Sequence, residues 1–174
     1  GRNLLAGISF GQTTSTPSSV PLKTDKLYFA PEVGFPLSRD SNLSIKYSFD
    51  QEDVKSATNS GLSPVIRDDI GKKNKSGLIF SFKLDKTNSV ITPTSGFDFK
   101  IIQEFNGLGG DISYSKSNLN FKTYRTLLRD DIILSSNLSS GIIIGSDASI
   151  MNRFTLGGDR LKGFRNQGIG PYDD

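Results

Sequence analysis

The side chains that could do chemistry in this 174-residue chain are few and poorly placed for catalysis. The sequence contains no Cys and no His, which removes thiol nucleophiles, thiolate metal sites, and the commonest general base and metal ligand. Pairs of adjacent carboxylates remain, and two of them are Asp130 with Asp131 and Asp173 with Asp174. Because neither pair has a His or an acidic cluster nearby, both are typical of turns. We therefore expect no catalytic residue, no metal ligand and no cofactor.

The glycine-rich end of the chain suggests a second chemistry, the binding of a phosphate group. Gly158 and Gly163 have the spacing of the two glycines in a phosphate-binding loop, but Phe164 stands where that loop requires a Lys. The sequence also has no strand–loop–helix pattern around these residues. We therefore do not expect a phosphate site here.

The basic residues are mostly scattered. The formal net charge is +3, and the one dense cluster contains Lys72, Lys73 and Lys75. The pattern predicts neither a recognition helix nor a basic stripe. We therefore expect no nucleic-acid partner.

The strongest signal in the sequence is an alternation of apolar and polar residues. In residues 42–49, for example, Leu43, Ile45 and Tyr47 lie between polar residues. Successive side chains of a strand point to opposite faces, so this alternation predicts a strand with one apolar and one polar face. Similar stretches recur along the chain, and no stretch indicates an amphipathic helix. We expect seven strands, at about residues 3–11, 27–36, 41–50, 76–86, 95–106, 111–124 and 131–145.

Two of these strands are irregular. Pro31 lies inside the second and weakens its assignment, because proline cannot donate a hydrogen bond to a ladder. In the sixth, Ile112 and Tyr114 occupy even positions, whereas Leu119 and Phe121 occupy odd positions. A bulge, or a strand leaving an apolar environment, would explain this change of phase.

The connections between the expected strands alternate in length. Residues 36–41 form a short turn, and residues 106–110 contain a Gly-Leu-Gly-Gly turn. Residues 51–75 form a long polar loop, and residues 87–95 form another connection. Short turns at one end and longer loops at the other are typical of a transmembrane barrel.

The polar faces of the strands favour a barrel over a soluble β-sandwich, which is the alternative fold. They carry charges inside the strands, at Lys46, Lys83, Asp98, Lys100 and Glu104. The chain has no run of about 18 apolar residues and so no transmembrane helix, but a transmembrane strand needs only about 9–11 residues. We therefore predict an all-β fold, an antiparallel transmembrane β-barrel.

The segment 153–174 carries a motif of high specificity. It reads R-F-T-L-G-G-D-R-L-K-G-F-R-N-Q-G-I-G-P-Y-D-D, and it resembles the loop of the Omp85 family, F-x-L-G-G, a short gap, V-R-G-F/Y and then G-I-G-P. The matching residues are Phe154, Leu156, Gly157, Gly158, Leu161, Lys162, Gly163, Phe164, Gly168, Ile169, Gly170 and Pro171. A looser resemblance to the family's D-x-R-D-x-x-x-x-P-x-x-G hairpin is carried by Leu84, Asp85, Pro93, Ser95 and Gly96.

This resemblance implies a fold and a domain organisation. Residues 1–174 would form part of one C-terminal outer-membrane barrel domain and would contribute about seven strands of a sixteen-strand barrel. Residues 150–174 would form the conserved loop inside the barrel lumen. The periplasmic POTRA domains and the terminal strands, which form the lateral gate, would lie outside this chain.

The resemblance also implies roles for loop residues. In the family an Arg of this loop meets acidic groups on the inner wall of late strands, and Lys162 replaces that Arg here. A guanidinium forms two forked hydrogen bonds with a carboxylate, whereas an ammonium acts as a point charge. The loop tip would be held less rigidly, or Arg160 or Arg165 would substitute. Gly163 would allow positive φ or close backbone approach, and Phe164 would pack against the wall.

The function implied is the folding and insertion of β-barrel proteins into the bacterial outer membrane, without an enzymatic step. The implied partners are outer-membrane lipid, unfolded β-barrel client proteins and accessory assembly lipoproteins. An Omp85-type secretion pore, either for two-partner secretion or TamA-like, is the alternative within the family. A diffusion porin and a soluble β-sandwich binding protein are the alternatives outside it.

Overall fold

The computed structural model describes residues 4–16, 22–56, 64–127, 132–145, 147–149, 152–154, 156, 163 and 169. Within them the chain forms seven strands and one short helix. These elements are β1 (Leu5–Ser15), β2 (Leu22–Pro36), β3 (Ser41–Ser56), α1 (Pro64–Arg67), β4 (Gly71–Asp85), β5 (Gly96–Gly110), β6 (Tyr114–Leu127) and β7 (Ile132–Ile144).

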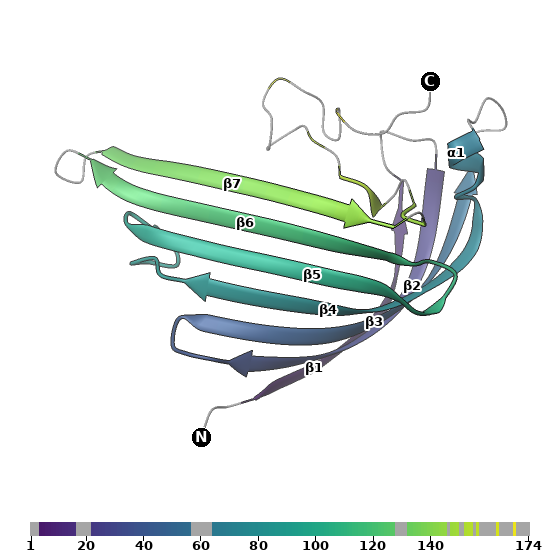
Figure 1. The fold of residues 1–174 in the computed structure, drawn as a ribbon, viewed down its shortest axis with the longest axis horizontal. Coiled ribbons are helices and arrows are strands. Elements are labelled where there is room, and N and C mark those ends of the chain that lie inside the picture. Colours follow the sequence, from purple (N-terminus) through teal and green to yellow (C-terminus); the bar gives the residue numbers. More distant parts are fainter. Residues whose placement is uncertain are drawn as a thin grey trace.

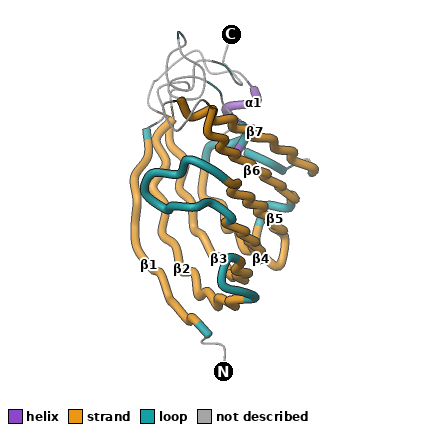
Figure 2. The backbone as a smooth tube through the Cα atoms, turned by 90° about the vertical axis from the view of Figure 1, so that its left-hand side faces the viewer, coloured by secondary structure: helices purple, strands orange, loops and turns teal. Residues whose placement is uncertain are grey.

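The strands form a single antiparallel sheet in chain order, β1-β2-β3-β4-β5-β6-β7 (Figure 1). Each strand pairs with the next one along the chain, and the sheet is bent into an arc rather than closed (Figure 2). The predicted all-β antiparallel fold with seven strands is confirmed.

Strands β1 to β5 are longer than predicted, and the predicted loop over residues 51–75 was too long. β3 continues to Ser56 and β4 begins at Gly71, with Asp53 opposite Lys72 in the ladder. Apart from Val54, the side chains on both faces are polar here, so the alternation stops although the backbone pairing continues. The single turn of helix α1 lies in the connection, where no helix was expected.

The predicted Gly-Leu-Gly-Gly turn at residues 106–110 was also wrong. These residues extend β5, and the turn lies at residues 111–113. Gly107, Gly109 and Gly110 have φ values of 124°, 127° and 106°, which distort the end of the strand without ending it. The register shift in this region lies between β4 and β5, at Lys75 and Gly77.

The change of phase predicted in the sixth strand has a simpler origin than a bulge. β6 keeps one register with β5 and with β7 along its whole length. Leu119 and Phe121 lie on one face, and Tyr114 lies on the opposite face, where it is buried. The two halves of the strand therefore place apolar residues on different faces.

Pro31 remains inside β2. It lies opposite Ile8 of β1, whereas the ladder between β2 and β3 skips Ala30 and Pro31. The missing proline N–H therefore interrupts one ladder locally and does not end the strand.

The register places most apolar side chains of the seven strands on one face, here called the outer face. Phe10, Phe29 and Phe49 lie side by side on β1, β2 and β3, for example. Many of these side chains are exposed, Phe10 to 79%, and no described element packs over them. The apolar outer-face residues are Ala6, Ile8, Phe10, Leu27, Phe29, Val33, Phe35, Leu43, Ile45, Tyr47, Phe49, Leu78, Phe80, Phe82, Leu84, Phe97, Phe99, Ile101, Phe105, Leu119, Phe121, Ile132, Leu134, Leu138, Ile142 and Ile144.

The opposite face, here called the inner face, is polar and carries the covering segments. Its strand residues include Lys26, Glu32, Asp50, Lys75 and Lys116. A soluble β-sandwich would bury its apolar face against a second sheet. Within the described residues the polar face is the one that is covered, as expected of the lumen of a membrane barrel.

Candidate functional site

Four charged side chains form a cluster on the inner face of β2, β3 and β4. The ammonium nitrogen of Lys26 lies 2.8 Å from Asp50 and 3.8 Å from Glu52. That of Lys75 lies 3.2 Å from Asp50 and 3.9 Å from Glu52. Asp50, Glu52 and Lys75 are buried, with 2% of Asp50 exposed. Because two cations face two carboxylates, the charges of the cluster are balanced. The ion pairs link three strands and leave no net charge that would bind a ligand.

The cluster was not apparent from the sequence because two of its members, Glu52 and Lys75, lay in the predicted loop over residues 51–75. Asp50 and Glu52 are two residues apart and therefore share a face of β3. Lys72 and Lys73 of the predicted basic cluster lie on opposite faces of β4, and Lys73 pairs with Asp69 at 3.2 Å. Reading residues 50–56 and 71–75 as paired strands would have revealed the arrangement.

The connection between β3 and β4 covers the inner face at one end. Ile66 of α1 is fully buried, and Leu22, Val54 and Ile112 are buried at the same end of the sheet. Asp69, just after α1, accepts a hydrogen bond from the hydroxyl of Ser149 at 3.0 Å. This contact joins the connection to the segment that follows β7.

The segment after β7 also contacts the inner wall directly. The ammonium of Lys116 donates a hydrogen bond to the carbonyl oxygen of Asn152 at 2.9 Å. The same nitrogen lies 4.7 Å from the centre of the Phe154 ring. A Cβ placed on Gly141 would overlap that ring. The segment therefore runs over the inner faces of β6 and β7.

Two further backbone contacts shape this segment. Leu156 and Ile169 form an antiparallel bridge with N–H to carbonyl distances of 2.7 and 2.9 Å. Gly163, which lies between them in sequence, has a φ of 94°, the left-handed conformation considered for it from the sequence. Residues 156 and 169 thus come together at the base of the conserved loop.

A cleft of about 700 Å³ lies between this segment and the wall. Phe154 and Leu156 line one side. The wall contributes Lys100, Asn118 and Asn120, and Asn120 donates hydrogen bonds to Asn137 and Ser139 at 3.2 and 2.7 Å. The cleft is therefore lined by amides, hydroxyls, one ammonium group and four apolar side chains, with no pair of groups suited to acid–base chemistry.

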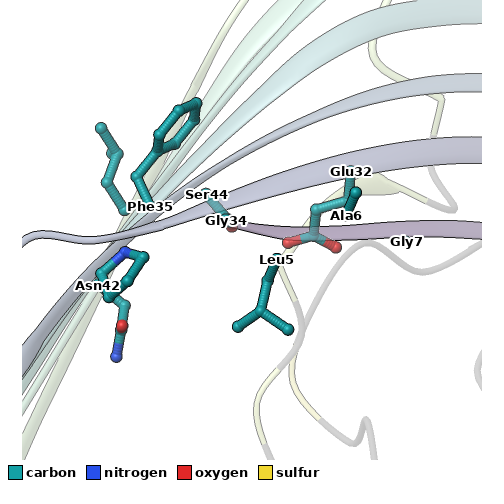
Figure 3. Close-up of a pocket in the computed structure, with 10 residues that line it drawn as sticks. Leu5, Ala6, Gly7, Glu32, Gly34, Phe35, Asn42 and Ser44 are labelled. Atoms are coloured by element: carbon teal, nitrogen blue, oxygen red, sulfur yellow. The ribbon is translucent and has the colours of Figure 1, made fainter. Parts of the chain in front are cut away.

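A second, smaller depression of about 320 Å³ lies beside β1 (Figure 3). Phe35 and Asn42 point to opposite sides of the sheet there, as the register requires. Glu32 is the one charged side chain among its lining residues. A lone carboxylate at a sheet edge gives no basis for a reaction or a metal site.

The hairpin motif joins β4 to β5 at the end of the sheet opposite α1. Asp85 accepts hydrogen bonds from the backbone N–H and the hydroxyl of Thr87, at 3.1 and 2.6 Å. Gly96 has a φ of 100°, and a Cβ there would overlap the carbonyl oxygen of Lys86. Pro93 lies in the connecting loop. The Asp and the Gly therefore have structural roles in the turn.

Sequence reasoning missed the residue that organises this loop, Asn88. Its side-chain oxygen accepts the backbone N–H groups of Thr94 and Ser95, each at 3.0 Å, and its amide nitrogen donates to the Thr94 hydroxyl at 2.7 Å. The tendency of Asn to bond nearby backbone groups in turns is the signal that could have identified it.

Most of the predicted loop residues lie outside the described part of the chain. Phe154, Leu156 and Gly163 are placed, as reported above. The remaining predicted residues lie outside it, namely Gly157, Gly158, Leu161, Lys162, Phe164, Gly168, Gly170 and Pro171, together with Arg160 and Arg165.

The described residues contain no group of three His, Cys, Asp or Glu side chains arranged for a metal ion. Among the described helices, none has the length and apolar character needed to cross a bilayer.

Comparison with known proteins gives a family. A profile of the Omp85 superfamily domain matches residues 3–174. The crystal structure of BamA from Haemophilus ducreyi lacking POTRA domains 1–3 superimposes with a TM-score of 0.76 over 98% of this chain and 36% of that one, at 17% identity. The barrel fold is thus shared.

The sequence relatives come from animals and from bacteria. The sorting and assembly machinery component 50 homolog A of Xenopus laevis is 32% identical over 93% of this chain, and the mouse homolog is 30% identical over the same share. The outer membrane protein assembly factor BamA of Neorickettsia risticii is 27% identical over 81% of the chain. The chain spans about a third of the animal relatives (35%) and 19% of that BamA.

The predicted bacterial location thus becomes a broader statement, an outer membrane of either a bacterium or a mitochondrion. The chain belongs to the Omp85 superfamily and forms part of its outer-membrane β-barrel.

Proposed function

We propose that the protein folds other β-barrel proteins and inserts them into an outer membrane. The observation that carries this proposal is the combination of a continuous, uncovered apolar face with a polar face that the Omp85 loop segment overlies. In lipid every backbone N–H and C=O group must have a hydrogen-bond partner. A client strand therefore needs a route into the membrane along which these groups stay hydrogen-bonded. A barrel of this kind would offer that route along its wall.

The role is not enzymatic. Omp85 assembly factors act without a chemical step, and the prediction that this chain is not an enzyme is confirmed by its family. The partners proposed are outer-membrane lipid, unfolded β-barrel clients and accessory assembly lipoproteins.

The proposed full protein has a sixteen-strand barrel preceded by POTRA domains. Residues 1–174 would be the middle of that barrel, with the segment 150–174 in its lumen. The bacterial outer membrane is the location proposed from the loop motif. The animal relatives support mitochondria as the second location. Fractionation of the source cells, with antibodies to the full-length protein, distinguishes the two.

The insertion activity is tested with the full-length protein in lipid vesicles. A urea-unfolded β-barrel client is added, and its folding is followed by the change in gel mobility of unheated samples. We expect faster folding than in protein-free vesicles. An equal rate with and without the protein contradicts the proposal.

A secretion pore is the second candidate, because a lumen loop also suits a channel that opens for one substrate. Planar-bilayer recording separates it from an insertase. A large, steady conductance combined with no effect on client folding would favour a pore.

Lys162 is proposed to hold the loop tip against acidic groups of the barrel wall. Replacing it by Ala removes the charge, whereas Lys162→Arg restores the family's residue and its two forked hydrogen bonds. We expect Lys162→Ala to lower the rate of client folding and Lys162→Arg to preserve it. Equal rates for both variants and the wild type would remove Lys162 from the mechanism.

A further inference from the structure

A glycine on the inner wall creates the space for an aromatic side chain of the segment after β7. Gly141 lies on the inner face of β7, opposite Asn118 of β6. A Cβ at this position would overlap the ring of Phe154. The ring can therefore rest on the backbone of β7 only because residue 141 has no side chain, an arrangement known to stabilise glycines in sheets.

A cation on the neighbouring strand completes the contact. Lys116 lies opposite Ile143, so it is the diagonal neighbour of Gly141 on the same face. Its ammonium contacts the Phe154 ring, 4.7 Å from the centre, and bonds the carbonyl oxygen of Asn152 at 2.9 Å. One side chain of the wall thus holds both the ring and the backbone of the segment.

The segment is also held upstream. Ser149 donates a hydrogen bond to Asp69, and both residues are buried. Only four residues lie between Ser149 and Phe154, so the two contacts restrain the chain on both sides of this stretch. Downstream, Leu156 pairs with Ile169 at the base of the conserved loop.

We propose that Phe154, Gly141 and Lys116 form an anchor that fixes where the conserved loop leaves the inner wall. The anchor is a positioning contact, separate from the role proposed above for Lys162. This inference rests on the proposed function of the segment as a lumen loop. Phe154 remains 37% exposed, and that part of the ring faces the cleft, so the contact is an anchor at the wall and not part of a closed core.

The test measures the position of the segment in the full-length protein in lipid vesicles. Residues 1–174 contain no Cys, so Leu156→Cys is introduced as the labelling site and any Cys elsewhere in the full-length protein is replaced by Ser. The reaction of the new thiol with a membrane-impermeant maleimide is timed. Phe154→Ala and Gly141→Val are each expected to raise the labelling rate about tenfold, because the aromatic and cation contacts are lost. Phe154→Tyr keeps the ring and is expected to label at the unmodified rate.

Lys116 supplies a milder variant that leaves the glycine and the ring intact. Lys116→Met is expected to raise the labelling rate about threefold, and Lys116→Arg is expected to leave it unchanged because a guanidinium also stacks on a ring. Gly7→Val is the matched control for Gly141→Val, because Gly7 also lies on the inner face and has open space around it. It is expected to have no effect on labelling.

Only variants that retain the heat-modifiable band of a folded barrel are compared. If Phe154→Ala and Lys116→Met both label at the unmodified rate, the anchor does not exist. Client folding is measured in the same vesicles. A change in labelling together with wild-type protein that does not accelerate client folding would support the anchor and reject the proposed function, so the two failures are distinguishable.

Discussion

The two faces of this sheet use the same strands under different physical constraints. On the outer face the apolar side chains of β1 to β7 form a continuous surface that no described element covers. On the inner face, charged and amide side chains bond to partners that are distant in sequence, such as Lys26 to Asp50 and Ser149 to Asp69. Any apolar side chain suits a position on the outer face, whereas a position on the inner face often requires a side chain that bonds to one particular partner.

This difference explains why substitutions on the two faces should behave differently. Hydrocarbon provides no hydrogen-bond partners, so a charged side chain on the outer face would lose its hydration and gain no new partner. The inner face already carries polar and charged side chains. It can therefore accommodate a further charged side chain at a position outside the ion-pair cluster.

The largest effect is expected for a charge on the outer face. Phe80 lies near the middle of β4 on that face, where its ring packs edge-on against Phe105 at 6.1 Å. Phe80→Arg should destabilise the full-length barrel by up to about 4 kcal/mol, as for arginine near a bilayer midplane. Ser81→Arg, one residue further and on the inner face, should cost far less. Urea titration of the folded barrel in vesicles measures both.

Equal losses for Phe80→Arg and Ser81→Arg would contradict the assignment of the two faces. A larger loss at Ser81 would reverse it, and would indicate that the Phe-bearing face meets water or another protein.

The second effect concerns the buried charge cluster on the inner face. Asp50→Ala removes the nearer of the two carboxylates that Lys26 and Lys75 share, and it should lower the free energy of unfolding by about 3 kcal/mol, as when one partner of a buried ion pair is removed. Asp53→Ala is the control, since Asp53 lies on the other face and pairs with the exposed Lys55. It should cost less than about 1 kcal/mol.

These values are measured by the same urea titration. A loss at Asp50 no larger than at Asp53 would mean that water reaches the cluster freely in the full barrel.

The third effect is conformational. Gly96→Ala places a Cβ at a φ of 100° and against the Lys86 carbonyl oxygen, so it should cost about 1–3 kcal/mol. Gly7→Ala meets open space within β1 and should be neutral or slightly stabilising, because Ala loses less conformational entropy on folding than Gly. Melting of both variants by gel mobility after stepwise heating checks the contrast. Similar melting temperatures would show that the hairpin adjusts to the new side chain.

The same comparison shows what the sequence could predict. Alternation such as Leu43, Ile45 and Tyr47 depends on neighbours in the chain, and it correctly predicted an antiparallel sheet with an apolar and a polar face. It stopped at the end of the apolar surface, where Asp53 faces Lys72 in the ladder and both faces are polar. The strand ends were therefore underestimated.

The inner contacts could not be predicted in the same way. The pairs Lys26 with Asp50 and Lys116 with Phe154 depend on the register and on the path of the chain after β7. No local pattern encodes either. The loop motif indicated the family, but the fit of Phe154 on Gly141 required the structure.

The smallest effect is expected at Lys83, and it sharpens the contrast with Lys75 of the same strand. Both lysines lie on the inner face of β4 and each contacts two carboxylates; Lys83 lies 3.2 Å from Asp85 and 3.4 Å from Asp98. The Lys83 side chain is 46% exposed, however, against 10% for Lys75. Exposed pairs contribute about 0–1 kcal/mol and are screened by salt, so Lys83→Met should cause a small loss that disappears in high salt. The loss at Asp50 should persist under the same conditions, because salt screens buried pairs much less. A salt-independent loss at Lys83 would show that the lumen excludes ions at the hairpin end of the barrel as well as beneath α1.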